Sequence, residues 1–405
     1  MSEMASKVFN WVNTRLPIVN TFERHLSKHP VPKKVNFWYL FGALASVVLI
    51  IQIVTGIWLI MPYSNTEEGA FASIEYIMRD VDYGWVIRYM HTTGASMFFA
   101  VVYMHMFRGL LYGSYQKPRE LVWIFGCTIY LVMMAEGFLG YVLPYGQMSY
   151  WGAQVIISLF GAIPYIGESL ELWVRGDYYI SGITVSRFFA LHVVALPLVL
   201  IALVFLHLVA LHEVGAGNPE GVDIEKHVDD DGVPLDSIPF FPYKVLNALV
   251  GIGVFMTVFA IIMFFFPEGG GYFIEMANFQ EANPLVTPEH IAPVWYYAPY
   301  YTMLRAIPDP LGGLIIMGAA VAIFFVVPWL DQSKVASIRY KGIYSKIAIA
   351  LFGISFLTLG YLGTVSVTET RKLISIICTV MYFAFFLLMP IYTKFEKTLE
   401  VPERL

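Results

Sequence analysis

Eight long apolar stretches restrict this chain to a membrane fold. Each is about as long as the 20 or so residues that a helix needs to cross a bilayer. They cover residues 37–61, 84–111, 121–142, 186–211, 244–266, 311–330, 345–366 and 373–394. Hydrophobic residues make up 58% of the 405 residues and charged residues only 14%, a balance that soluble domains do not show. The sequence therefore predicts an all-α membrane protein with eight transmembrane helices.

The connection 143–185 is also apolar, but Pro164 and several glycines interrupt it. We expect short helices that lie in the membrane interface here, and a ninth crossing is the alternative.

Lysine and arginine gather in the N-terminal tail, in 112–120, in 331–346 and at the C-terminus, whereas the alternate loops are poor in them. The positive-inside rule then places both termini in the cytoplasm. The acidic loop 213–243 weakens this assignment, although acids count little in the rule. The basic segment 1–35 does not resemble a cleavable signal and is predicted to form a surface helix.

Only two cysteines occur, Cys127 and Cys378, and both lie in apolar stretches. A disulfide framework, a cysteine-rich metal site and covalent haem attachment through C-x-x-C-H are therefore excluded.

Four histidines lie inside two of the apolar stretches. His91 and His105 are 14 residues apart, and His192 and His207 are 15 residues apart. On a helix, these spacings correspond to rises of about 21 and 22.5 Å, so each helix offers one histidine near each membrane face. Both stretches cross in the same direction, which pairs His91 with His192 near the outer face and His105 with His207 near the inner face.

Two facing imidazoles at each level, without sulfur or carboxylate ligands, suit six-coordinate haem iron better than zinc or a di-iron centre. Iron ligation would offset the cost of placing imidazoles in hydrocarbon. Arg88 and Arg108 lie close to these histidines in the sequence, and each is predicted to bind the propionates of the nearer haem.

Glycines repeat the same spacing on two further stretches. Gly42 and Gly56 are 14 residues apart, as are Gly126 and Gly140. Because glycine destabilises a helix, paired gaps at these depths are interpreted as walls against which a flat ring packs. Close helix packing is the alternative reason for small residues.

Several stretches together resemble cytochrome b, the membrane core of the quinol:cytochrome c oxidoreductase. They are GWVIRYMHTTGASMFFAVVYMHMFRGLLYGSY, GYVLPYGQMSYWGA, RFFALH, LHLVALHE and PVWYYAPYYTMLRAIPDPLGG. The resemblance runs from about residue 20 to residue 394. It implies two non-covalent b-type haems on the four histidines, in a four-helix bundle formed by the first four helices.

The resemblance also implies two quinone sites. The quinol-oxidation site near the outer haem would be built from Tyr141, Gly152, Pro293, Tyr296 and Tyr301. The quinone-reduction site near the inner haem would use two further residues, His212 and Lys244.

The outer site departs from the family pattern at two positions. Val294 stands where the family usually has a glutamate that is thought to accept a quinol proton, and Tyr145 replaces a usual tryptophan. Glu289, Tyr141, Tyr296 or a water chain remain as alternative proton acceptors.

Two departures concern the inner site and the second histidine pair. Val245 replaces a common aspartate. The 15-residue spacing of His192 and His207 is one longer than usual and rotates one imidazole by about 100° unless a bulge absorbs it. Pro197 is the expected place for that bulge.

The resemblance divides the chain into five parts and implies partners. The parts are an N-terminal segment 1–35, the di-haem bundle 36–215, a cytoplasmic loop 216–243, a C-terminal domain 244–394 and a tail 395–405. The partners are a Rieske-type iron–sulfur protein, a cytochrome c-type subunit, quinone and a second copy of the complex. We expect the membrane to be a bacterial inner membrane and expect no nucleic-acid partner.

Two other functions are alternatives. A histidine-relay transporter would carry charges near the midplane, and the only acid deep in the stretches is Glu136, close to one end. A haem-bearing anchor of another quinone-linked dehydrogenase would leave the PVWY and LPYGQ loops without a purpose.

Overall fold

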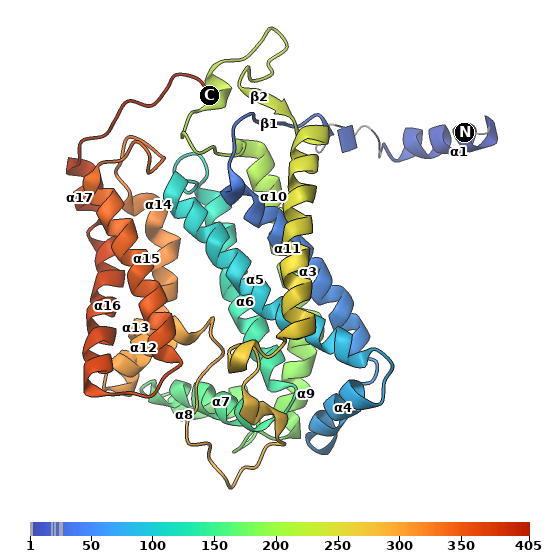
Figure 1. Ribbon diagram of the computed structural model, residues 1–405, viewed down its shortest axis with the longest axis vertical. Coiled ribbons are helices and arrows are strands. Elements are labelled where there is room, and N and C mark those ends of the chain that lie inside the picture. The colour runs from blue at the N-terminus through green and yellow to red at the C-terminus, as the bar shows by residue number, and fades with distance from the viewer. Residues whose placement is uncertain (1–2, 18, 20–21, 24–26) are drawn as a thin grey trace.

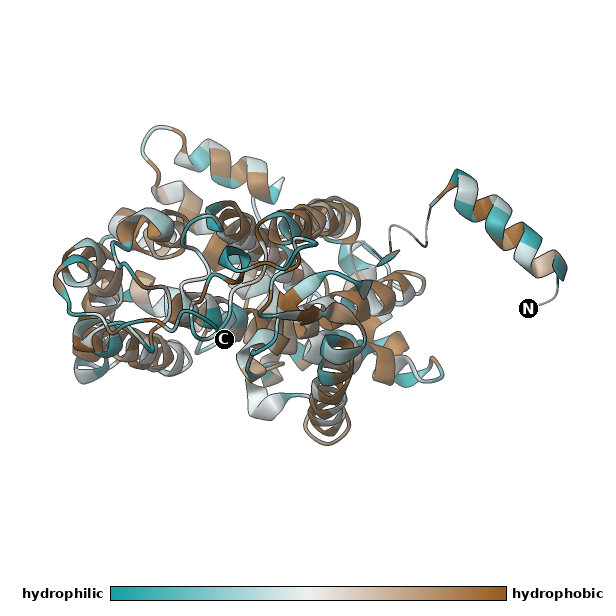
Figure 2. Cartoon of the chain, turned by 90° about the horizontal axis from the view of Figure 1, so that it is seen from above, coloured by the Kyte–Doolittle hydropathy of each residue, from teal (hydrophilic) through white to brown (hydrophobic). Residues whose placement is uncertain are grey.

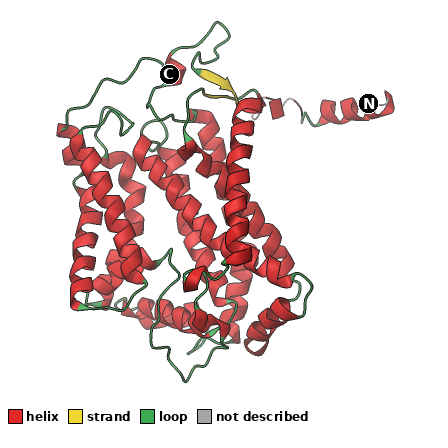
Figure 3. Cartoon of the chain, viewed as in Figure 1, coloured by secondary structure: helices red, strands yellow, loops and turns green. Residues whose placement is uncertain are grey.

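The computed structural model describes residues 3–17, 19, 22–23 and 27–405. The remaining positions of the predicted N-terminal segment 1–35 lie outside the described residues. Helices dominate the described chain, and the strand pair lies at the end that carries both termini (Figure 3). We call that end the termini face and the opposite end, crossed by α7 and α8, the α7–α8 face (Figure 1).

Eight helical segments are long and apolar enough to cross a membrane, which confirms the prediction. They are Phe37–Leu59, Gly84–Tyr112, Glu120–Val142, Gly182–Val214, Phe240–Phe265, Pro310–Leu330, Ile343–Gly363 and Glu369–Leu387. Many of their large apolar side chains are exposed, as a lipid-facing surface requires. The ribbons of the long helices are coloured mostly as hydrophobic in Figure 2.

The spans contain the following helices. They are α3 (Phe41–Leu59), α5 (Gly84–Tyr112), α6 (Glu120–Val142), α9 (Gly182–Ala190), α10 (Leu196–Val214), α11 (Val245–Phe265), α13 (Pro310–Ala322), α14 (Val327–Leu330), α15 (Ile343–Gly363) and α16 (Glu369–Leu387).

Shorter elements lie at the two faces. They are α1 (Glu3–Arg15), α4 (Glu67–Arg79), α7 (Gln147–Ser158), α8 (Gly167–Arg175), α12 (Ala298–Ala306), α17 (Met389–Phe395), β1 (Pro30–Pro32) and β2 (Ser237–Pro239). Helices α7 and α8 run across the ends of the spanning helices (Figure 1), so the connection 143–185 forms interfacial helices instead of a ninth crossing. Helix α1 stands apart from the body on the termini face (Figure 2).

Two groups of helices stand side by side (Figure 1). One contains α3, α5, α6, α9 and α10, and the other contains α12 to α17. Helix α11 joins the first group, since its Phe255 and Phe259 pack with Leu44 and Val48 of α3. The boundary predicted at residue 244 stays a prediction, because this packing does not decide it.

A short two-stranded sheet and a group of charged side chains lie at the termini face. Strands β1 and β2 pair antiparallel, and Asp236, next to β2, accepts hydrogen bonds from Lys33 at 2.5 Å and from Arg404 at 3.1 and 3.2 Å. The C-terminal tail is therefore tied to the loop that precedes α11.

Candidate functional site

The two predicted histidine pairs meet in the first group of helices. The ring centroids of His91 and His192 are 6.3 Å apart, with the ring planes at 83°. Those of His105 and His207 are 6.4 Å apart, at 63°. Two imidazoles on opposite sides of one metal ion, each bonded at about 2 Å, would have ring centres about 6 Å apart. Both pairs therefore have the separation that a shared iron requires.

A π-helical turn sets the direction of His192. The turn covers Leu191–Ala195 and joins α9 to α10. One extra residue is stored in such a turn, which compensates for the 15-residue spacing. The predicted bulge is present, but it lies just before Pro197 instead of at the proline, because the widened turn frees the backbone that the proline ring would otherwise strike.

Each of the four glycines faces one histidine ring. A Cβ atom would meet Cε1 of the facing imidazole: at Gly42 it would lie 3.0 Å from His105, and at Gly140 it would lie 2.4 Å from His192. The corresponding distances are 3.4 Å for Gly56 with His91 and 3.4 Å for Gly126 with His207. The gaps therefore admit the imidazoles at the two levels where a macrocycle is expected.

The second ring nitrogen of each histidine near the α7–α8 face has a partner. Nδ1 of His91 lies 2.9 Å from the hydroxyl of Thr55. Nδ1 of His192 lies 3.0 Å from the backbone carbonyl oxygen of Glu136 and 3.0 Å from its carboxylate Oε1. A proton on Nδ1 of His192 leaves the Nε2 lone pair free for a metal.

The pair near the termini face is arranged differently. Nδ1 of His105 lies 3.3 Å from the Arg108 guanidinium. Nδ1 of His207 has no hydrogen bond that meets the distance and angle criteria within the described part of the chain, although the backbone of Val122 interacts with the ring. A guanidinium donates only to a lone pair, so this contact requires an unprotonated Nδ1 on His105.

Arg88 and Arg108 are half-buried cations whose Nε atoms are buried and whose hydrogen bonding is incomplete. Nε of each has no hydrogen-bond partner among the described residues. Arg108 donates to Ser114 at 2.9 Å, and its guanidinium lies 4.9 Å from the ring centroid of Tyr39. Each is therefore suited to bind an anionic group that enters beside a histidine pair.

Tyr141 meets a residue that the sequence reasoning missed. Its hydroxyl donates to the Glu275 carboxylate at 2.6 Å, and Gly152 lies against the Tyr141 ring. Glu275 precedes the short 3₁₀ helix Met276–Phe279, which is fixed on α7 because Ser149 N–H donates to Asn278 at 2.8 Å. Tyr141 and Glu275 are 134 positions apart in the sequence, and no sequence signal indicates this contact.

Burial raises the pKa of Glu275 to about 7, although the hydrogen bond from Tyr141 opposes the shift. Glu275 also raises the pKa of the Tyr296 hydroxyl, for which burial is the larger cause. Glu275 is thus a half-buried acid with a pKa near neutral pH, beside two predicted site residues.

The PVWY segment is anchored by aromatic contacts. The Tyr296 ring stacks on Phe99 with centroids 3.9 Å apart, and its backbone oxygen accepts a hydrogen bond from Tyr103. Val294 is buried and has no titratable group, while Pro293 is half-buried in the loop before it.

Two other residues proposed for this region contact the loop in different ways. Tyr301, on α12, donates to the Ile291 carbonyl at 3.2 Å. Glu289, the alternative proton acceptor, is exposed.

His212 and Lys244 both lie toward the termini face. His212 is near the end of α10, and its ring centroid is 4.5 Å from that of His29. Lys244 directly precedes α11. The backbone N–H of Phe240 donates to the His29 carbonyl at 3.0 Å, which holds His29 beside the start of this span.

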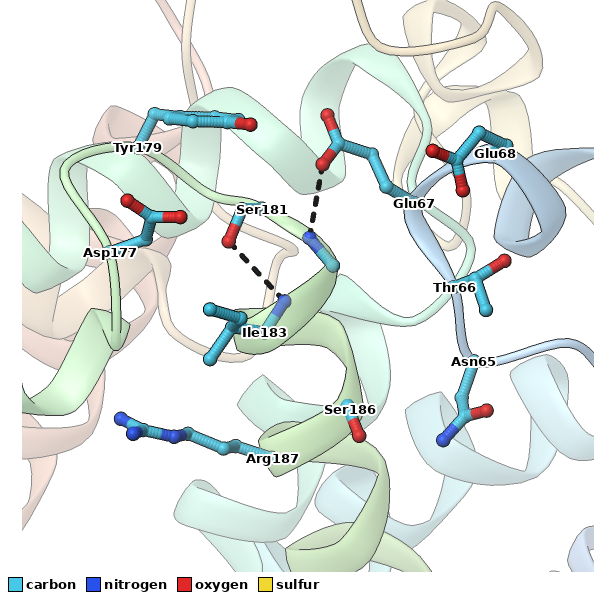
Figure 4. A pocket seen from close by; sticks show the side chains of 11 residues that line it. Asn65, Thr66, Glu67, Glu68, Asp177, Tyr179, Ser181, Ile183, Ser186 and Arg187 are labelled. Atoms are coloured by element: carbon cyan, nitrogen blue, oxygen red, sulfur yellow. Dashed lines mark hydrogen bonds between the residues drawn. The ribbon is translucent and has the colours of Figure 1, made fainter.

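A separate open pocket of about 600 Å³ lies on the α7–α8 face between α4 and α9 (Figure 4). Glu67, Glu68, Asp177 and Arg187 are among its lining residues. None of the predicted site residues lines it. Its polar walls do not suit an apolar quinone ring.

The described residues contain no group of three or more His, Cys, Asp or Glu side chains that could hold a metal ion. The fold and the paired imidazoles instead define a polytopic helical membrane protein with two two-histidine sites in one bundle. Two family profiles match the chain: "Cytochrome b/b6/petB" over residues 26–215 and "Cytochrome b(C-terminal)/b6/petD" over residues 281–383.

Full-length relatives agree with these matches. Cytochrome b of Allochromatium vinosum is 55% identical over 412 aligned residues, which cover 100% of this chain and 99% of the relative. Cytochrome b of Rickettsia prowazekii is 46% identical, covering 98% of this chain and 96% of the relative. A solved chain described as "Hyperthermophilic respiratory Complex III" superposes with a TM-score of 0.89 at 36% identity, covering 96% of this chain and 99% of that one.

The chain therefore belongs to the cytochrome b family. Membership confirms the resemblance noted in the sequence and implies haem binding, because the family is one of haem proteins. The eight spans make the chain a multi-pass membrane protein.

Proposed function

We propose that the chain is the cytochrome b subunit of a bc1-type quinol:cytochrome c oxidoreductase. It would oxidise quinol near the α7–α8 face and reduce quinone near the termini face, thereby contributing to a proton gradient. The observation that carries this proposal is the presence of two facing imidazole pairs at opposite ends of one bundle. The likeness to a respiratory Complex III chain supports it.

The ligand assignment follows from the same pairs. His91 and His192 would hold one b-type haem, and His105 and His207 the other. The two haems, when bound, would supply one-electron carriers between the two faces of the membrane. Gly42, Gly56, Gly126 and Gly140 would leave room for the ligands.

Arg88 and Arg108 would neutralise the haem propionates. Their buried, unpartnered Nε groups favour this role, because a buried cation without an anion is costly. His105 must carry its proton on Nδ1 to ligate through Nε2, so Arg108 would leave that nitrogen when it binds a propionate.

Tyr141 and Glu275 would receive a proton from the quinol. The Glu275 carboxylate accepts a hydrogen bond from the Tyr141 hydroxyl. The pKa of Glu275, about 7, lets this carboxylate both accept and release a proton near neutral pH. Glu275 would thus take the place of the carboxylate that is missing at Val294. Tyr296, Tyr301, Gly152 and Pro293 would shape the quinol site.

At the termini face, His212 and Lys244 would bind the quinone that is reduced. Val245 contributes no carboxylate there, and His29 is a titratable group in contact with His212. The termini would lie in the cytoplasm of a bacterial cell, as the distribution of lysine and arginine favours.

The proposed partners follow from the same assignment. A Rieske-type iron–sulfur protein would dock near the α7–α8 face, together with a cytochrome c-type subunit, and the whole complex would be dimeric. Membership of a multi-subunit complex is supported by the similarity to the Complex III chain.

The proposal is tested on the purified protein by pyridine haemochrome quantification and a redox titration of the reduced spectrum. We expect two b-type haems per chain with different midpoint potentials. One haem or none per chain would overturn the assignment of both histidine pairs.

A further inference from the structure

Among the described residues, a single acidic side chain touches one of the four histidines. Glu136 lies on α6, one turn before Gly140, and its carboxylate Oε1 is 3.0 Å from Nδ1 of His192. The Glu136 side chain is 18% exposed and that of His192 is 17% exposed. The contact is therefore largely withdrawn from solvent, inside a membrane span.

Glu136 has no cation to balance it in the described protein. The His192 imidazole is its only ion-pair partner there within 4.0 Å, and Oε2 is buried without any hydrogen-bond partner. A buried carboxylate that lacks a positive partner costs several kcal/mol. A cationic metal centre ligated by His192 would offset that cost.

The other three histidines have different surroundings at Nδ1. His91 meets the neutral hydroxyl of Thr55, His105 meets the cationic Arg108, and His207 meets only backbone. The negative charge is therefore confined to the pair near the α7–α8 face.

We propose that Glu136 is a positioning and tuning residue for the haem near the α7–α8 face, an inference that rests on the proposed function. The backbone carbonyl and carboxylate of Glu136 hold the His192 proton on Nδ1, so the Nε2 lone pair would be free to ligate the haem iron. The carboxylate charge favours ferric over ferrous iron, because the ferric centre carries one more positive charge. Glu136 thus lowers the midpoint potential of this haem and leaves that of the other haem unchanged.

The test is a redox titration of both haems in the holoprotein carrying Glu136→Gln. The amide keeps the shape and removes the charge. At a fixed potential, we expect the ratio of reduced to oxidised haem at this site to rise about tenfold, which is a shift of about 59 mV for one electron. The second haem provides an internal reference in the same sample.

Two further variants separate charge from other effects. Glu168→Gln removes an exposed carboxylate from the same face. We expect both potentials in this variant to stay close to those of the unmodified protein. Glu136→Thr repeats the neutral substitution in case the glutamine variant does not assemble.

The outcomes distinguish this inference from the proposed function. A neutral Glu136 variant with both haems bound and both potentials unchanged would overturn the inference alone, as would an equal shift of both haems. An unmodified protein with fewer than two haems would overturn the proposed function.

Discussion

The imidazole of His91 faces that of His192 across 6.3 Å, with the ring planes at 83°. The second pair repeats this separation at the other end of the same two helices. Because His91 precedes His105 and His192 precedes His207, α5 and α10 run in the same direction. Two independent sites on shared helices lead to a first prediction.

Replacing His207 with alanine is expected to remove one haem and leave the other. The two pairs share no ligand, so the His91–His192 site keeps both of its imidazoles. Pyridine haemochrome quantification should fall from two haems per chain to one. His227→Ala, which removes an exposed loop histidine, provides the matched control. Loss of both haems in His207→Ala alone would contradict the pairing.

The glycines predict a graded response at one haem. Gly140→Ala would place a methyl group 2.4 Å from the His192 ring, whereas Gly56→Ala would place one 3.4 Å from the His91 ring. Overpacking of this kind costs about 1–3 kcal/mol. We expect Gly140→Ala to weaken haem retention about tenfold or more and Gly56→Ala to have a smaller effect, as measured by haem loss during dilution. Equal retention in the two variants would show that His192 moves freely.

Glu275→Gln is expected to slow quinol oxidation by about 10²-fold, the lower end of the effect of a general base. Reduction of the haems by quinol under pre-steady-state conditions measures this step. Glu289→Gln is the matched control, because that acid is exposed in the following loop. The reverse result, with only Glu289→Gln slow, would reassign the proton acceptor.

The pH dependence of the same step follows from the raised pKa of Glu275. Only the ionised carboxylate accepts a proton, so the rate should rise with pH up to about 7 and then level off. Glu275→Gln should abolish this inflection. An inflection that persists in the variant would belong to another group.

A carboxylate restored at position 294 should rescue the loss. Val294 is buried beside Trp295 and Tyr296, in the segment that the family resemblance assigns to quinol oxidation. We expect Glu275→Gln/Val294→Glu to regain at least a tenth of the original rate. Val294→Gln in the same background has a similar shape without the acid and should give no rescue.

A buried ion pair at the termini face predicts a stability effect. Lys341 Nζ lies 2.6 Å from Asp331, which also accepts hydrogen bonds from Tyr115 at 2.7 Å and from Gln116 at 3.0 Å. Lys341→Met leaves this buried carboxylate without its cation and should destabilise the fold by about 3–5 kcal/mol. Lys341→Met/Asp331→Asn should be less damaging than the single variant when thermal unfolding is compared in detergent.

Much of the fold could be predicted because its sequence signals are regular in length or in spacing. Apolar runs of bilayer length gave the eight spans, and matched spacings gave the two histidine pairs. The sequence predicts a bulge at Pro197, whereas the π-helical turn lies just before this residue. A proline indicates that a helix must deform but not which residues of the adjoining turn absorb the change.

The rest depends on contacts that no regular spacing in the sequence indicates. Glu275 reaches Tyr141 through a loop that docks on α7 by way of Asn278, and no spacing encodes that docking. Glu136 was visible as an isolated acid near the end of a span, but its contact with His192 depends on how two helices rotate against each other. Side-chain direction across a loop or between helices is set by tertiary packing.

Because of the π-helical turn at Leu191–Ala195, the directions of the His192 and His207 side chains do not depend strictly on the number of residues between them. A helix that holds one extra residue in a wider turn can gain or lose that residue while the imidazoles at its two ends keep the same direction. Deleting one residue from this turn should therefore convert it to α-helix and shorten the span locally, without turning His207 away from His105. The length of this segment is free to vary by one residue between related chains, and the iron-binding geometry need not change with it.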